Sequence, residues 1–360
     1  MHCKVASFIL SLAMTGLLIA ANAQAEYLVA QANIENIKER RDVVVTQDVS
    51  PLTRKWGDVS FTLSGLIEVE GSLVHVEGSD EDDDLRMSTV QIGLVAELSP
   101  WLGGHVVGLW EEDDTEPMVV DEAVVTLISP CQLFGQTPAL HLGRQYLPFG
   151  KFNSGMISDP LTLELGETHT TAALLTIEGA SWSASVGAFE GAVEDGDGGI
   201  DSWVAVVEVT PRAGLTLGAS WLSDLAESDA GLVQDEGLYR NEVPGWSAFA
   251  TLQHGTVGLT AEYLAAAKSF KSGQVEVGED LTGRRPEAWN VELSWQPFDH
   301  LQLAARYEAA HAYQSNVIRY GVTASYGLCD YALLAVEYLH ADADGTAPEH
   351  AFTAQLAVEF

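Results

Sequence analysis

Hydrophobic and polar residues alternate strictly along most of the chain between residues 57 and 360. In residues 289–296, for example, every second residue is apolar, beginning with Trp289, and the residues between them are polar. A period of two residues is typical of a β-strand that has one apolar face and one polar face. Such strands occur in soluble sandwiches and in membrane barrels, so the length and spacing of the segments decide between the two.

The alternating segments are too long for an ordinary soluble sheet. Most are about 9–13 residues long, close to the about 9–11 that a tilted strand needs to cross a bilayer, whereas soluble strands average about 5–6. Their number is about 16, and an even number is typical of single-chain bacterial barrels. We therefore predict an all-β fold, a transmembrane antiparallel β-barrel of about 16 strands. The predicted strands are residues 58–77, 85–98, 104–113, 118–129, 138–147, 170–180, 182–190, 201–210, 213–224, 245–254, 256–268, 286–297, 300–311, 316–327, 329–340 and 350–360.

The connections between these strands alternate between short turns and long loops. One end of the barrel is therefore tight and the other is irregular, as expected for periplasmic turns and extracellular loops. The sheet must close on itself, because an open edge in hydrocarbon leaves backbone groups unpaired. The predicted long loops are residues 78–84, 111–117, 148–169, 191–199, 225–244, 269–285 and 341–350.

The N-terminal residues indicate export. His2 and Lys4 form a weakly basic start, residues 5–20 are apolar, and the small residues around Ala23 suit signal-peptide cleavage. We predict a signal peptide at 1–25, a helical and extended periplasmic leader at 26–56, and an outer-membrane barrel at 57–360. The leader is either a simple periplasmic tail or a short coiled coil that helps a homotrimer to assemble.

Aromatic residues mark the barrel surface and its last strand. The segment 350–360 alternates and finishes with Phe360, a pattern recognised by the outer-membrane barrel-assembly machinery. Other aromatic residues lie on the apolar parity near strand ends, where they suit the girdles at the two membrane interfaces. These girdle residues are Trp203, Trp221, Tyr263, Trp289, Trp295, Tyr307 and Tyr338.

The charge excludes several classes of function. The net charge is −35, from 52 acidic and 17 basic residues, which argues against nucleic-acid binding and against a basic membrane-surface patch. The chain is 47% hydrophobic, so it is not disordered. Cys131 and Cys329 fall in predicted turns far apart around the barrel, which favours two free thiols over a disulfide.

No pattern in the sequence indicates catalysis or a cofactor. Nucleophile-elbow, zinc-protease and P-loop motifs are absent, and no metal-ligand spacing is present. The acidic run at 194–199 resembles part of a calcium loop but lacks a closing Glu, so a solvated loop is the better interpretation. We therefore expect no enzyme, no cofactor and no metal. A barrel enzyme would need a nucleophile–His pair at the rim, and a structural barrel would need an occluded lumen.

The polar parity of the strands predicts an acidic lumen. If the apolar parity faces lipid, then many carboxylates face the interior, with Arg306 nearly their only basic companion on these strands. Rings of carboxylates favour cations, although any water-filled interior must also be polar. The predicted lumen residues are Glu68, Glu70, Glu178, Glu208, Glu262, Glu292, Arg306, Glu308, Glu337 and Glu359.

The loop at 148–169 is less acidic and more apolar than the other loops. We expect the apolar side chains of such a loop to be buried against another part of the protein, and the barrel interior is the available site. It is therefore a candidate constriction loop, although it would alternatively cover the rim. The residues expected to border the constriction are Arg144, Lys151, Asp159, Glu164 and Glu167.

Basic residues gather in two other loops. They form either a mouth site that captures an anionic or metal-chelated solute, or a set of charges that offsets the acidic loops. The members of this mouth cluster are Arg240, Lys268, Lys271, Arg284 and Arg285.

Three short motifs carry a resemblance to a known family. Gly-Arg-Gln-Tyr-Leu-Pro-Phe-Gly at 143–150, Ser-Asp-Pro-Leu-Thr-Leu at 158–163 and Leu-Gly-Glu-Thr at 165–168 resemble the LbtU-type siderophore porins. The resemblance implies an outer-membrane barrel with a short N-terminal helical piece that takes up a ferric siderophore without a plug domain. We therefore expect a porin that passes a small solute, with a general or cation-preferring diffusion porin as the alternative.

Overall fold

The computed structural model describes residues 52–78, 81–112, 118–193, 199–233, 239, 242–270, 283–313 and 315–360. The predicted signal peptide and all but the last residues of the predicted leader lie outside these ranges. No helix in the described part of the chain is long and apolar enough to cross a membrane.

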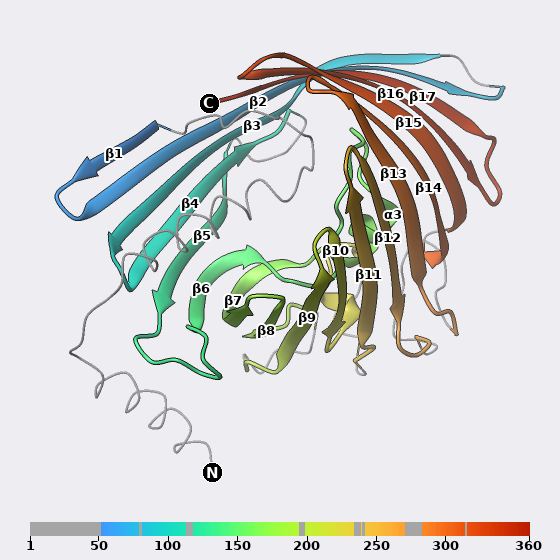
Figure 1. Ribbon diagram of the computed structural model, residues 1–360. Coiled ribbons are helices and arrows are strands. Elements are labelled where there is room, and N and C mark those ends of the chain that lie inside the picture. Colours follow the sequence, from blue (N-terminus) through green and yellow to red (C-terminus); the bar gives the residue numbers. More distant parts are fainter. Residues whose placement is uncertain are drawn as a thin grey trace.

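The described residues form one antiparallel sheet that closes into a barrel (Figure 1). Each of β2 to β17 pairs with its neighbours in sequence, and β17 pairs with β2, so these 16 strands form a closed ring. The predicted fold class is confirmed. The strands are β1 (Leu52–Trp56), β2 (Val59–Val76), β3 (Asp82–Ser99), β4 (Leu102–Trp110), β5 (Val119–Ile128), β6 (Ala139–Tyr146), β7 (His169–Gly179), β8 (Trp182–Phe189), β9 (Ser202–Arg212), β10 (Leu215–Leu222), β11 (Gly245–His254), β12 (Val257–Ala266), β13 (Glu287–Phe298), β14 (Leu301–Tyr313), β15 (Ser315–Cys329), β16 (Ala332–Ala343) and β17 (Glu349–Glu359).

The wall has its apolar face outward. On β13, Leu293 and Trp295 are 50% and 48% exposed, whereas Asn290 and Glu292 are 2% and 5% exposed. This is the reverse of a soluble protein, and it is typical of a barrel whose outer surface contacts lipid. Register extends the pattern around the ring, because directly opposite residues share a face: Val291 pairs with Tyr307, and Tyr307 pairs with Tyr320.

The two ends of the barrel differ in their connections. At one end most turns are tight, and Gly214 and Gly255 adopt φ of +78° and +59° there, conformations that favour glycine. At the other end lie the longer loops, of which the β6–β7 connection is the most structured. The β14–β15 connection is the short exception at the loop end.

The ring closes where β17 meets β2. Glu349 pairs with Val76 at one end of this seam and Glu359 pairs with Leu66 at the other. Phe360 extends the pairing, since its N–H donates to the Gly65 carbonyl at 3.0 Å and its own carbonyl accepts from the Gly65 N–H at 2.8 Å. β1 pairs with β2 beyond this point, with Leu52 opposite Leu63. The sequence analysis did not predict β1, which is short and exposed.

Candidate functional site: the segment inside the barrel

The segment between β6 and β7, residues 147–168, runs along the inner side of the wall. It contains one short helix, α3 (Leu161–Gly166), which contacts β12, β13 and β14. Figure 1 shows α3 inside the ring of strands, beside β12 and β13. Pro160 precedes the helix, and its fixed φ and missing N–H suit a helix start. This is the placement that the apolar character of the segment predicts.

Apolar side chains hold the segment in the interior. Leu147, Phe149, Leu161 and Leu165 are buried and belong to one apolar cluster. The rest of that cluster comes from inward wall positions, from the β10–β11 and β12–β13 loops, and from Val193 in the β8–β9 loop. It includes Leu222, Leu225, Tyr239, Leu264, Phe270 and Ala288. Burying one such side chain contributes about 1.5–3 kcal/mol, so the segment and the two loops form a joint core at the loop end of the lumen.

Glu262 of β12 fixes the start of the segment. One carboxylate oxygen accepts the Lys151 N–H at 2.8 Å, and the other accepts the Phe152 N–H at 3.0 Å. The hydroxyls of Ser247 and Thr162 also donate to this carboxylate. Residues 150–158 are not in regular secondary structure, so their buried N–H groups need partners from elsewhere. Glu262 supplies acceptors for two of them.

Three more inward glutamates accept backbone N–H groups of the segment. Glu292 of β13 accepts the Gly155 N–H at 2.6 Å and the Ser154 hydroxyl at 2.7 Å. Glu337 of β16 accepts the Ile157 N–H at 2.6 Å. Glu308 of β14 accepts the Leu161 N–H at 2.8 Å. Hydrogen bonds to an ionised acceptor are about twice as strong as neutral ones. We call Glu262, Glu292, Glu308 and Glu337 the anchoring glutamates.

Arg306 of β14 balances these charges. Its guanidinium lies 3.2 Å from Glu308 and 3.7 Å from Glu292, and its side chain is 1% exposed. It also donates to the Ser154 hydroxyl, to the Ser158 carbonyl and hydroxyl and to the Asp159 carbonyl, over 2.7–3.1 Å. A buried charge is tolerated when it is paired and hydrogen-bonded, and these contacts use both terminal nitrogens of Arg306, whereas its buried Nε has no hydrogen-bond partner among the described residues. Arg306 is therefore the hub that joins the middle of the segment to the wall.

These contacts change the interpretation of the predicted lumen residues. The anchoring glutamates and Arg306 do point inward, but they bind the segment. Glu178 and Glu208 are inward and only partly covered, and Glu68 is buried. Glu70 pairs with Arg86 at 3.3 Å and accepts the Gln355 amide at 2.6 Å.

The residues predicted to border the constriction fall in two groups. Lys151 lies 3.4 Å from Glu208, Glu164 pairs with Arg319 of β15, and Asp159 is exposed. Glu167 lies farther along, where its carbonyl accepts the Asp229 N–H at 2.7 Å. These four belong to the inserted segment.

Arg144 is placed differently from the prediction. It lies opposite Ala123 and Thr171, on the same face as Leu142, whose side chain is 37% exposed. Since residues two apart on a strand share a face, Arg144 belongs to the outward set and does not line the interior. The error came from grouping Arg144 with the segment that follows it.

Arg319 is the functional residue that the sequence analysis missed. It lies on the inward parity of β15, opposite Glu308, and pairs with Glu164. The alternation alone would have found it, because Arg319, Gly321 and Thr323 form the polar series of that strand.

Only part of the mouth cluster can be located. Arg240 and Lys271 lie outside the described residues. Lys268 is exposed, the Arg285 guanidinium donates to the Ala266 carbonyl, and the Arg284 carbonyl accepts the Phe270 N–H.

Asp224 organises the β10–β11 loop next to the segment. One of its oxygens accepts the Ala226 N–H at 3.0 Å, the Tyr239 hydroxyl at 2.8 Å and the Val243 N–H at 3.1 Å. Burial raises the pKa of Asp224 to about 6 even though these three donors oppose the shift. Burial also raises the pKa of Tyr239. The loop is joined to the inserted segment through the Asp229 N–H and the Glu167 carbonyl.

The described residues show no metal centre and no disulfide. No three His, Cys, Asp or Glu side chains among them lie close enough to hold a metal ion. Cys131 and Cys329 are free and exposed.

A closed wall with its apolar face outward and a segment folded into its interior defines an outer-membrane barrel of the porin type. Solved structures agree on this fold. The outer membrane channel DcaP of Acinetobacter baumannii matches with a TM-score of 0.63 and 12% identity, covering 85% of this chain and 99% of that one. An anion-selective porin from Comamonas acidovorans matches with a TM-score of 0.62 and 12% identity, covering 84% and 100%.

Curated relatives are distant. A UPF0422 protein of Coxiella burnetii is 24% identical over 247 residues, covering 64% of this chain and 52% of the relative. A UPF0422 protein of Legionella pneumophila strain Philadelphia 1 is 23% identical over 300 residues, covering 72% and 55%. The chain thus spans about half the length of the curated relatives it matches. No family model matches the chain.

Proposed function

We propose that this chain is a passive outer-membrane porin whose passage is narrowed by the segment 147–168. The observation that carries the proposal is the row of anchoring glutamates, which fixes an irregular segment across the inner wall. Passage through such a pore depends on its width, its polar groups and its charges, with no covalent step. Lys151, Asp159, Glu164 and Glu167 are the residues of the segment that we expect solutes to meet.

Conductance in planar bilayers tests this role. The wild-type chain is expected to give discrete, stable channel steps. The double variant Glu292→Gln with Glu337→Gln keeps the size of the side chains but weakens the acceptors for the Gly155 and Ile157 N–H groups. We expect larger or unstable steps, because the segment is no longer held. Glu178→Gln, on the inward parity near the turn end of β7, is the control for loss of an inward charge alone: its steps should stay stable, whatever its effect on selectivity. Unchanged steps in the double variant would contradict the proposal.

We propose a modest preference for cations. The anchoring glutamates and Arg306 are occupied by the segment, so the charge that a solute meets is smaller than the sequence count suggests. Three inward carboxylates do not bind the segment backbone in any described contact: Glu70, Glu178 and Glu208. The basic side chains paired with them are Arg86 and Lys151, so the carboxylates outnumber the basic groups. Reversal potentials in a salt gradient measure this preference, and an anion preference would rule it out.

We propose a ferric siderophore as the solute, with general diffusion of small solutes as the alternative. The three motifs that resemble siderophore porins coincide with the end of β6, the inserted segment and α3. A mutant lacking the gene is expected to lose uptake of labelled ferric siderophore while uptake of small sugars stays normal. Equal loss of both solutes would favour the general porin.

We propose two protein partners. The strand β17 and Phe360 are suited to recognition by the barrel-assembly machinery, and Phe360→Ala is expected to lower the folded fraction in outer membranes, with Phe298→Ala as an exposed aromatic control.

A homotrimer is the second proposal. Mass measurement in mild detergent tests it, and a monomer would exclude it.

A further inference from the structure

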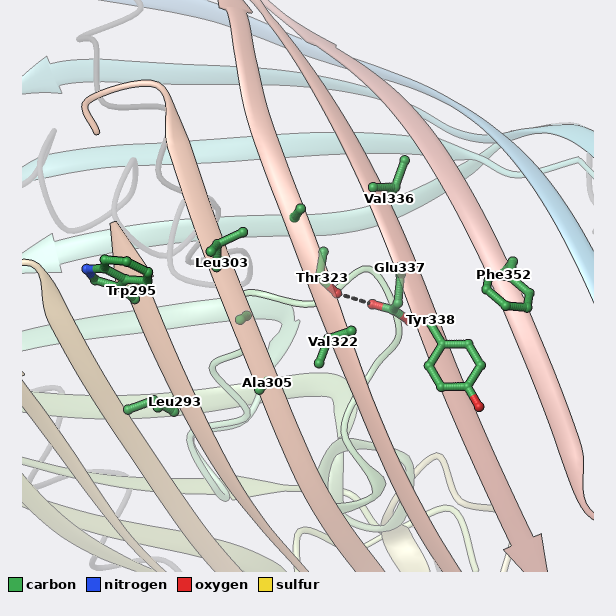
Figure 2. Close-up of a pocket in the computed structure, with 12 residues that line it drawn as sticks. Leu293, Trp295, Leu303, Ala305, Val322, Thr323, Val336, Glu337, Tyr338 and Phe352 are labelled. Atoms are coloured by element: carbon green, nitrogen blue, oxygen red, sulfur yellow. Dashed lines mark hydrogen bonds between the residues drawn. The ribbon is translucent and has the colours of Figure 1, made fainter. Parts of the chain in front are cut away.

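The outer face of β13 to β17 has a groove of about 510 Å³ (Figure 2). Ala305 of β14 and Ala324 of β15 lie between larger outward neighbours, because Ala305 is opposite Leu293 and Val322, and Ala324 is opposite Leu303 and Val336. The small side chains of these two alanines leave a depression between the larger side chains on either side. The other outward residues that border it are Trp295, Tyr338 and Phe352.

A row of ring side chains borders the groove on its loop side. Strand register places Tyr307, Tyr320, His340, His350 and His75 directly opposite one another on β14, β15, β16, β17 and β2. Neighbouring ring centroids are 6.5, 4.7, 4.6 and 6.5 Å apart in that order. We call this row the ring ladder. Tyr307 and Tyr320 lie two residues from Ala305 and Val322, so the ladder and the groove adjoin.

The histidine end of the ladder lies close to the loop ends of β16 and β17, since β16 ends at Ala343 and β17 begins at Glu349. Ring side chains with polar tips gather at membrane interfaces, where one end is apolar and the other is wet. The Tyr338 hydroxyl lies 2.9 Å from His350 Nδ1, and the Nδ1 atoms of His340 and His350 are 3.4 Å apart. Imidazole and phenol groups donate to phosphate oxygens. Glu81 lies 3.9 Å from His75, and Asp342 is exposed two residues from His340 on the same face of β16. No ion pair described for this face involves His340 or His350, so we place the anion at that pair.

We propose that this face binds one lipopolysaccharide molecule of the outer leaflet, with an acyl chain in the groove and a lipid A phosphate at His340 and His350. The position of the groove determines the occupant. The groove lies on the lipid-facing side of the wall, and the ring ladder adjoins it toward the loop end. Apolar contact is available along the groove, and the imidazole groups lie only toward its loop end, whereas Trp295 brings a single indole N–H toward the turn end.

Two other occupants are weaker. A metal ion at the histidines is disfavoured, because the described residues contain no ligand group of three with suitable spacing. A second copy of the chain would cover the Tyr and His side chains that mark a lipid interface. The inference depends on the membrane location of the barrel and not on its transport activity.

Native mass spectrometry of the detergent-purified full chain with added lipid A tests the site. Ala305→Leu with Ala324→Leu fills the groove, and His340→Ala with His350→Ala removes the headgroup donors. Ala248→Leu on the outward face of β11 is the matched control. We expect each double variant to weaken lipid A binding about tenfold, the effect of losing one well-formed set of contacts, and the control to bind as the wild type does. Diacylglycerol, which has no phosphate, should respond to the groove variant alone.

Several results would overturn the inference. Equal loss in the control would mean non-specific annular lipid, and undiminished binding in the groove variant would mean that the groove is unused. If filling the groove splits an oligomer while lipid A binding is unchanged, then the groove is a subunit contact. Heat-modifiable gel mobility, measured on every variant, confirms that each barrel is folded. Failure to conduct would count against the porin proposal alone.

Discussion

Inward glutamates in this barrel differ in what they contact, and the difference is visible only residue by residue. Glu262 accepts two backbone N–H groups and two hydroxyls, whereas Glu208 is half-buried beside Lys151. Both lie on the polar parity of their strands, so the sequence assigns them the same role. A carboxylate that binds the chain itself contributes to order, and one that faces water contributes to the charge met by a solute.

Arg306→Ala should release the middle of the inserted segment. The change leaves Glu292 and Glu308 buried without their counter-charge, and breaking a buried pair typically costs about 3–5 kcal/mol. We expect faster proteolysis within 150–160 and unstable channel steps. Arg86→Ala is the control, because the Arg86 side chain is 48% exposed in its pair with Glu70 and pairs near solvent contribute about 0–1 kcal/mol. Equal behaviour of the two variants would contradict the role of Arg306 as a hub.

The β10–β11 loop should be more stable in acid than at neutral pH. The pKa of Asp224 is raised from 3.8 to about 6 in the folded loop, so the folded state favours the protonated form. The resulting stabilisation is complete below about pH 4 and is lost as the pH rises through 6, and its size is on the order of 2–3 kcal/mol.

Hydrogen exchange of the Ala226 and Val243 amides measures this effect after correction for intrinsic rates. Protection should be higher at pH 4.5 than at pH 7.5 in the wild type. Asp224→Asn cannot ionise, so its protection should be independent of pH over this range. The same pH response in both proteins would show that another group is responsible.

Among the elements, α3 and its segment show which features a sequence pattern predicts and which it does not. The apolar character of 147–168 predicts that the segment leaves solvent, and Pro160 marks a break in it. The particular wall that it lies against could not be predicted, because that depends on backbone N–H groups of Lys151, Gly155 and Ile157, which carry no sequence signal. Arg144 was misplaced for a related reason: its motif joins a strand residue to the segment, and only register shows that it faces outward.

Gly166→Ala should push α3 away from β12. A Cβ at this position would lie 2.2 Å from Leu264 Cδ1, and overpacking of this kind typically costs about 1–3 kcal/mol. We expect increased protease sensitivity in 147–168 and altered conductance. At Gly71, an added Cβ would meet Leu85 at an ordinary 3.7 Å, so Gly71→Ala is the matched control and should behave as the wild type does.

For the molecule as a whole, the fold was far more predictable than the site. Sixteen strands were predicted from alternation, because every strand repeats the same outward-apolar pattern and the turns interrupt it regularly. β1 was missed since five residues are too few to show a period. Interior contacts such as Arg306 with Ser158 join residues far apart in sequence, and no local pattern records them.

The purified barrel should require detergent or lipid to remain in solution. Outward side chains such as Val322, Leu293 and Phe352 are half exposed or more, and a continuous apolar band of this kind aggregates in water. Detergent removal is expected to produce large aggregates by light scattering, while exchange into lipid nanodiscs preserves a single species. A monodisperse chain in plain buffer would contradict the membrane assignment.

The pairing of β2 with β17 also sets the order in which this wall can be completed. Of the sixteen ring strands β2 is made first, and one of its edges must stay available for β17 while the fourteen strands β3 to β16 are synthesised and exported. Contacts between such remote parts of a chain form slowly. A chain truncated before β17 therefore forms a sheet with two unpaired edges. The backbone N–H and C=O groups of these edges would be exposed to the hydrocarbon of the membrane.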